Sequence, residues 1–136
     1  MNSSEKKQEL AMYRLAQAQE SLAEAQYLFD GDKSPRSVIN RAYYSMFYSI
    51  LALLIFEPYS SSKHSGVLAY FNQHFIKTGL FSEGLGRAVN KAFDLRQRAD
   101  YREHTVIAHD QVAPFLDEAR RFLNAAKDHL KSNGGI

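Results

Sequence analysis

The segment from residue 35 to residue 56 is apolar on nearly every side of the helix that its spacing predicts. A helix that is apolar all round must be covered by other elements. Its most hydrophobic run, residues 42–56, is interrupted by Ser45 and Ser49, and it is shorter than the roughly 18–20 apolar residues that a membrane-spanning helix needs. It is therefore predicted to be the buried central helix of a bundle, with no membrane contact. Its apolar residues are Val38, Ile39, Tyr43, Tyr44, Met46, Phe47, Ile50, Leu51 and Leu54.

Helical periodicity also dominates the rest of the chain, and the alternation typical of strands is nearly absent. Further helices are predicted over residues 4–29, 64–75 and 82–101, and from about 110 to 131. Gly31 is expected to end the first as a left-handed cap, and Ser34 and Pro35 to start the next. The predicted fold is all-α: an antiparallel up-and-down helical bundle of four main helices plus a short extra helix. The first helix carries a coiled-coil-like seam of Ala11, Leu15, Ala18, Leu22, Ala25 and Phe29.

Length and composition limit the number of domains and the chemistry. A chain of 136 residues predicts one domain, residues 1–136, with a core of about 4–131 and a frayed tail at 132–136. The chain has no cysteine, which excludes disulfides, thiolate metal sites and cysteine nucleophiles. The polar N-terminus shows no signal peptide, so a cytoplasmic location is expected. The net charge of +2 permits contact with nucleic acid without indicating it.

An arginine interrupts an otherwise apolar stripe in the predicted helix 82–101. A guanidinium stays charged at any working pH, so its burial is costly unless it is paired or meets an anion. We therefore expect Arg96 to be partly buried, against Asp100 or a tyrosine of the second helix. Alternatively, Arg96 and Asp100 form an ordinary pair four residues apart, and Arg98 and Arg102 form a solvated face. The stripe consists of Leu85, Val89, Ala92, Arg96 and Ala99.

The histidines do not predict a metal centre. His104 and His109 are five residues apart, not the three or four that place ligands on one helical face, and no carboxylate cluster joins them. No glycine-rich phosphate loop is present either. No metal and no cofactor are therefore predicted. Lys63 and His64 open the predicted third helix, a place suited to a cap or an anion contact.

Three segments in this order resemble the HEPN superfamily, and more narrowly its stand-alone proteins of the UPF0332 type. The resemblance covers roughly residues 10–130. It implies a helical bundle that dimerises and pairs with a minimal nucleotidyltransferase as a toxin–antitoxin system. It also implies metal-independent RNA cleavage by an arginine followed, after four to six residues, by a histidine. The segments are Arg41-Ala42-Tyr43-Tyr44-Ser45-Met46-Phe47, Ser62-Lys63-His64-Ser65-Gly66-Val67 and Leu95-Arg96-Gln97-Arg98-Ala99-Asp100-Tyr101.

The arginine–histidine hallmark has two alignments here. Counted from Arg96, the hallmark position after four intervening residues is Tyr101. Counted from Arg98, five intervening residues lead to His104, which fits. In that alignment the histidine exchanges a proton with the ribose hydroxyl or the leaving oxygen, and the arginine stabilises charge on the phosphate. The Arg-x-x-Ala-Asp-Tyr form of this branch favours Arg96, with Tyr101 holding a phosphate or stacking on a base.

Two functions follow from these observations. The first is an RNA endonuclease, toxin-like, acting as a homodimer. The second is a non-catalytic module that binds a nucleotide or docks a minimal nucleotidyltransferase. The alanine-rich seam and the apolar second helix present more apolar surface than one small bundle covers, which also favours a two-fold dimer. The candidate catalytic residues are Arg96, Arg98, Tyr101 and His104, and the candidate binding residues are Arg41, Tyr44, Lys63, His64 and Asp100.

Overall fold

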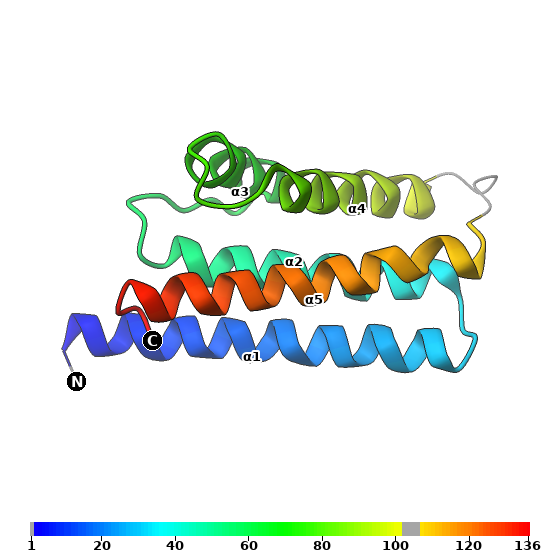
Figure 1. Ribbon diagram of the computed structural model, residues 1–136, viewed down its shortest axis with the longest axis horizontal. Coiled ribbons are helices and arrows are strands. Elements are labelled where there is room, and N and C mark those ends of the chain that lie inside the picture. Colours follow the sequence, from blue (N-terminus) through cyan, green and yellow to red (C-terminus); the bar gives the residue numbers. More distant parts are fainter. Residues whose placement is uncertain (1, 102–106) are drawn as a thin grey trace.

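A computed structural model describes residues 2–101 and 107–136, without the side chains of residues 98–101. No strand occurs within this described part, so the all-α prediction is confirmed. The four long helices alternate in direction, as the colour gradient of Figure 1 shows, and form an up-and-down bundle. The elements are α1 (Ser3–Asp30), α2 (Pro35–Leu54), α3 (His64–Phe71), the π-helical turn η1 (Asn72–Ile76), α4 (Glu83–Tyr101) and α5 (His109–Ser132).

Helix α2 is the central element of the bundle. It packs against α1, α3, α4 and α5, which satisfies the apolar surface that its sequence presents on all sides. The predicted seam of α1 is buried from Ala11 to Ala25, and its small residues let α1 and α2 approach closely. Among the described helices, none is long and apolar enough to cross a membrane. The α2 side chains with no exposed surface include Val38, Ile39, Ala42, Tyr43, Met46 and Ile50.

The end of α1 differs from its prediction. Gly31 has φ −84° and ψ 8°, so it is not the left-handed cap that the sequence predicts. The left-handed residue is Asp32, with φ 55°. The Gly31 amide still donates to the Tyr27 carbonyl at 3.0 Å, which continues the helical bonding by one residue and moves the turn to the aspartate. Aspartate is one of the few non-glycine residues that tolerate this conformation.

The third predicted helix is divided in two. Regular α3 ends at Phe71, and residues 72–76 continue as a π turn in which the Lys77 amide donates to the Asn72 carbonyl at 2.9 Å. The Asn72 side chain donates to the Leu68 carbonyl at 2.9 Å, so it competes for the acceptor of a regular helical bond. Its Nδ2 also donates to Asn90 of α4. The hydrogen bond between Asn72 and Asn90 therefore links the irregular turn to α4.

The last residues, expected to be frayed, fold back onto the bundle. Gly134 has φ +73° and reverses the chain after α5. The Gly135 amide then donates to the Leu130 carbonyl at 2.8 Å, as in a glycine-type helix cap. Gly135 is buried, and Ile136 packs against the core. Gly134 and Gly135 therefore form the turn that ends α5.

Candidate functional site

Arg96 lies in the C-terminal half of α4 and faces α2. Its Nη2 donates to the Tyr44 hydroxyl at 3.1 Å. Its Cζ lies 5.1 Å from the ring centre of Tyr44 and 5.5 Å from that of Tyr43. These distances are within the range of cation–π attraction. The prediction that Arg96 is partly buried against a tyrosine of the second helix is confirmed.

The charge of Arg96 has no described counterion. Within residues 2–97 and 107–136, no carboxylate lies within salt-bridge distance of its guanidinium. Its Nε is buried and has no hydrogen-bond partner there. Two aromatic faces and one hydroxyl fix the orientation of the cation without neutralising it. Such a group is well placed to bind an anion.

A second guanidinium flanks the same tyrosine. The Cζ of Arg41 lies 5.0 Å from the ring centre of Tyr44. Arg41 also donates to the Asn40 side chain, and it lies 3.7 Å from a carboxylate oxygen of the half-exposed Glu24. Tyr44 thus brings two cations together, although like charges repel each other. An anion between them would relieve that repulsion.

His64, at the start of α3, completes the cluster. Its Nδ1 lies 2.8 Å from the hydroxyl of Tyr43, and its ring stacks on Phe47 with 4.0 Å between ring centres. Burial, and then the charge of Arg96, lower the pKa of His64 below its ordinary value of 6.5. Burial raises the pKa of Tyr43, so its hydroxyl keeps its proton. Near neutral pH this part of the cluster is an uncharged imidazole bonded to an uncharged phenol.

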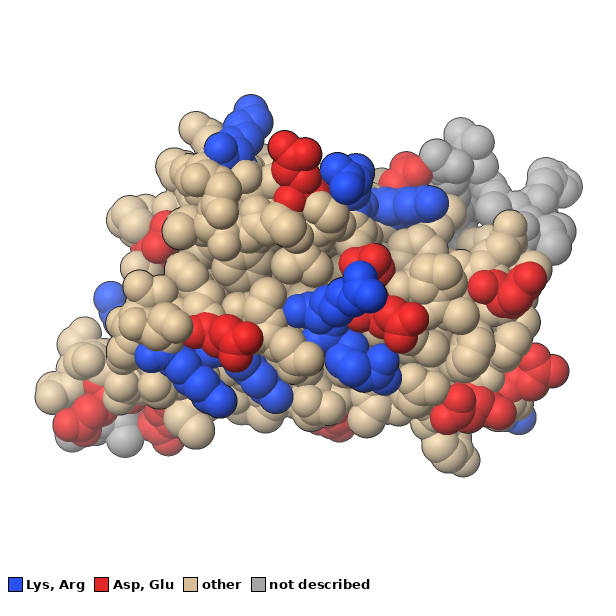
Figure 2. Space-filling model, in the orientation of Figure 1, with Lys and Arg blue, Asp and Glu red and all other residues tan. Residues whose placement is uncertain are grey.

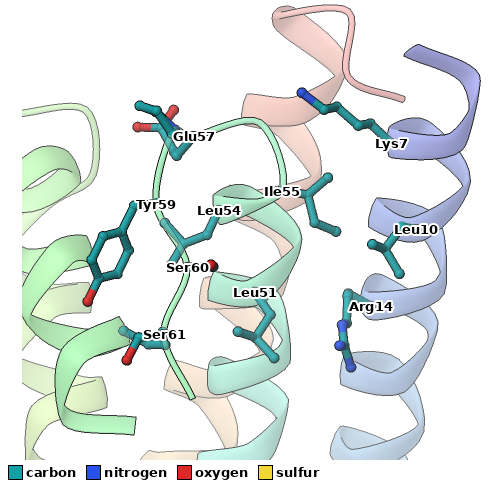
Figure 3. A pocket seen from close by; sticks show the side chains of 12 residues that line it. Lys7, Leu10, Arg14, Leu51, Leu54, Ile55, Glu57, Tyr59, Ser60 and Ser61 are labelled. Carbon is teal, nitrogen blue, oxygen red and sulfur yellow. The ribbon is translucent and has the colours of Figure 1, made fainter. Parts of the chain in front are cut away.

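A groove lies elsewhere on the molecule. It has a volume of about 610 Å³ and lies between the first turns of α1, the end of α2 and the loop that follows (Figure 3). It shares no residue with the cluster described above. Among the described residues, no group of three or more His, Asp or Glu side chains is arranged to hold a metal ion. The labelled lining residues are Lys7, Leu10, Arg14, Leu51, Leu54, Ile55, Glu57, Tyr59, Ser60 and Ser61.

Comparison with known proteins identifies the family. The HEPN domain family model matches residues 11–131. The chain belongs to the HEPN domain family. A UPF0332 protein of Thermotoga maritima is 38% identical over 119 residues, which cover 88% of this HEPN chain and 89% of the relative. A protein of Methanocaldococcus jannaschii named "Putative toxin" is 34% identical over 114 residues, 84% of each chain. A second of that name is 36% identical over 118 residues, covering 87% and 80%.

The cluster of this HEPN chain brings together four of the residues that the sequence singles out: Arg41, Tyr44, His64 and Arg96. Lys63 immediately precedes α3, and its side chain is exposed. Arg98, Asp100 and Tyr101 belong to the last turn of α4, and their side chains lie outside the described part. His104 also lies outside the described residues. Both alignments of the HEPN hallmark therefore stay predictions.

The sequence indicates a tyrosine of the second helix as a partner of Arg96, but it does not predict that Tyr43 and Phe47 contact His64. Both are buried, but Tyr43 binds His64 and Phe47 supports the imidazole face. One signal was available: Tyr43 and Phe47 are four residues apart, so they lie on one face of α2. The choice of His64 as their neighbour depends on the path of the loop between α2 and α3, which no periodicity encodes.

Proposed function

We propose that this HEPN protein is a toxin-like protein that binds RNA through its phosphodiester backbone at the cluster of Arg41, Tyr44, His64 and Arg96. The observation that carries the proposal is Arg96, which is half-buried, oriented by the Tyr44 hydroxyl and without a described carboxylate. A guanidinium held in one orientation suits the charged oxygens of a phosphate. The two relatives named as toxins support the biological class.

Binding in this proposal is local rather than spread over a broad basic surface. Figure 2 shows Lys and Arg side chains interspersed with Asp and Glu on one face of the molecule, and the net charge is only +2. Nucleic-acid binding through many phosphate contacts falls steeply with salt, in proportion to the number of phosphates neutralised. A small cluster with two arginines predicts a shallow dependence of affinity on salt.

The proposed reaction is metal-independent cleavage of RNA. The ribose 2′-hydroxyl attacks the adjacent phosphorus, the bond to the 5′-oxygen breaks, and a 2′,3′-cyclic phosphate forms. Arg96 or Arg98 stabilises the charge that develops on the phosphate. His104 takes or returns the proton. If Arg96 is the hallmark arginine, Tyr101 stands at the position of the histidine and holds the phosphate or stacks on a base. The protein acts as a homodimer, and a minimal nucleotidyltransferase is the proposed antitoxin partner.

One observation favours a second candidate, a non-catalytic module that binds a nucleotide or docks a nucleotidyltransferase. The described cluster offers hydrogen-bond donors and cations, while its histidine is bound at Nδ1 and has a lowered pKa. Such a set of groups is sufficient to bind an anion, and binding alone needs no proton transfer.

Incubation of the purified protein with total RNA distinguishes the two functions. We expect cleavage that survives EDTA and leaves cyclic or 3′-phosphate ends. His104→Ala and Arg98→Ala should abolish cleavage, and His104→Ala should leave RNA affinity nearly unchanged because it removes proton transfer and not binding. The control is Arg87→Ala, an exposed arginine of the same helix that pairs with the exposed Glu83.

Each other outcome has a definite meaning. If cleavage persists in His104→Ala and is lost in Arg96→Ala, Arg96 and Tyr101 form the working pair. If wild-type protein binds RNA without cleaving it, the non-catalytic module is the function. Cleavage that disappears with EDTA and returns with magnesium contradicts the proposed mechanism.

A further inference from the structure

His64 and Arg96 border the same two tyrosines. The His64 ring centre lies 5.9 Å from that of Tyr43 and 5.8 Å from that of Tyr44, and the Arg96 Cζ lies 5.5 Å and 5.1 Å from these rings. The imidazole thus has a fixed place beside a guanidinium that has no carboxylate partner among the described side chains. It comes from a third element, the N-terminus of α3, while the tyrosines come from α2 and the arginine from α4.

The hydrogen bond to Tyr43 determines which nitrogen of His64 carries the proton. The Tyr43 hydroxyl is buried, and among the described residues its only polar partner is His64 Nδ1. If Nδ1 carried the proton, the phenol hydrogen would be buried without an acceptor, which is costly. The phenol therefore donates to Nδ1, and in the neutral ring the proton is on Nε2. Nε2 has no hydrogen-bond partner in the described part of the chain.

We propose that His64 is a phosphate ligand whose Nε2–H donates to a non-bridging oxygen of the same phosphate that Arg96 binds. The inference rests on the proposed function for the polymer that carries this phosphate. Arg41, the second guanidinium near the Tyr44 ring, holds the same phosphate or the next one along the strand. Tyr43 and Phe47 act as positioning residues because they fix the tautomer and the plane of the imidazole.

This role differs from the proton transfer expected of a histidine in a ribonuclease. The lone pair that a general base needs is on Nδ1, and the Tyr43 hydroxyl occupies it. A neutral imidazole N–H is far too weak an acid to protonate a leaving oxygen near pH 7. The Nε2-protonated tautomer therefore suits neither proton abstraction nor protonation of a leaving oxygen. Its Nε2–H can instead donate to an anion. An anion would also compensate the charge of Arg96, one of the two causes that lower the pKa of His64.

The first test uses the imidazole nitrogen signals of the full-length protein in NMR. At pH 7 we expect the Nε2-protonated tautomer at His64. The probes are inorganic phosphate and a short oligothymidylate, which carries phosphodiesters but lacks the 2′-hydroxyl. Both should raise the pKa of His64, and oligothymidylate should shift its Nε2 signal. An Nδ1-protonated ring in the free protein, or a pKa unchanged by a saturating probe, overturns the proposal.

The second test uses two substitutions. Glutamine presents an N–H near the position of the imidazole Nε2, while alanine presents none. His64→Ala should weaken oligothymidylate binding about tenfold, the loss expected for a hydrogen bond to a charged group. His64→Gln should stay within about threefold of wild type. His74→Gln, at an exposed histidine of η1, is the matched control and should not differ from wild type.

RNA cleavage separates a ligand from a general base or acid. If His64→Gln binds the oligonucleotide normally but has lost cleavage, His64 exchanges a proton and the proposal is wrong. Normal binding by His64→Ala is equally decisive against it. If the protein neither binds nor cleaves RNA while phosphate still raises the pKa of His64, the proposed function fails and the phosphate ligand stands.

Discussion

At the scale of single residues, Arg96 is the side chain whose removal we expect to lower the free energy of unfolding most. Arg96→Ala removes a hydrogen bond to Tyr44 and the cation that covers two aromatic rings. We expect the free energy of unfolding to fall by about 1–2 kcal/mol in urea denaturation. Arg87→Ala should change it by less than about 0.5 kcal/mol, because that side chain is 75% exposed. Equal midpoints for Arg96→Ala and wild type would mean that these contacts contribute nothing.

His64 predicts a dependence of stability on pH. Its pKa is lowered in the folded protein, by burial and then by Arg96, so the unfolded chain binds the proton more readily. Stability should therefore be fully present above the ordinary value of about 6.5 and should fall as the pH drops below it. Thermal melts from pH 7.5 to pH 5 should show this loss in wild type and a smaller one in His64→Gln. Identical slopes for the two proteins would contradict the assignment.

The sequence predicts the contact of Arg96 with a tyrosine and names His64 as a binding residue, but it does not predict the bond between His64 and Tyr43. Arg96 stands out because a cation at heptad spacing among apolar residues needs a partner, and a tyrosine of the next apolar helix is an available one. The bond between Tyr43 and His64 joins residues 21 apart across a loop. Neither residue departs from its local pattern, since a buried tyrosine and a histidine at a helix start are both ordinary.

At the scale of elements, the loop after α2 determines where His64 lies, and Gly66 permits its path. A Cβ on Gly66 would lie 2.8 Å from the Ser61 hydroxyl and 2.9 Å from that of Tyr59. Gly66→Ala should therefore displace the loop and lower the free energy of unfolding by about 1 kcal/mol. Gly84→Ala is the control, because its nearest neighbour atom would be 3.8 Å away.

Gly84 lies in the first turn of α4, where alanine favours the helix. Gly84→Ala should raise the free energy of unfolding by up to about 0.5 kcal/mol in the same urea experiment. A destabilised Gly84→Ala together with an unchanged Gly66→Ala would show that loop packing does not position α3.

Periodicity predicts the helices themselves well because burial of an apolar face dominates their formation. The residues at which the helices end depend on weaker local interactions. The left-handed residue after α1 is Asp32 rather than Gly31, since one further amide finds a carbonyl. The π turn after α3 depends on Asn72, whose side chain reaches Asn90 on another helix. A tertiary contact of this kind cannot be inferred from spacing along the chain.

At the scale of the whole molecule, α1 carries four of the five large apolar side chains that are exposed among the described residues. Met12, Tyr13 and Tyr27 are 59%, 57% and 77% exposed, and Leu10 is 45% exposed. The α1 seam and α2, whose apolar surfaces led to the homodimer prediction, are covered within the chain itself. The exposed side chains of α1 support the proposed homodimer instead, because a second copy would cover them. Light scattering at micromolar concentration should give twice the chain mass of 15.5 kDa.

A polar substitution at the same place tests which surface forms the dimer. Tyr13→Ser should shift the light-scattering mass toward the monomer, while Tyr59→Ser, on the loop outside α1, should not. A wild-type mass near 15.5 kDa would exclude the dimer at that concentration.

The central claim is that Arg96 is an anion-binding group for RNA, and fluorescence anisotropy with a short labelled single-stranded RNA tests it most directly. EDTA removes metal ions, and a fixed low salt concentration keeps the ionic strength the same for every variant. Arg96→Ala should weaken binding by about tenfold or more, the loss expected for a charge-assisted contact. Arg87→Ala, the exposed arginine of the same helix, should bind like wild type. Equal affinities for Arg96→Ala and Arg87→Ala would contradict the claim.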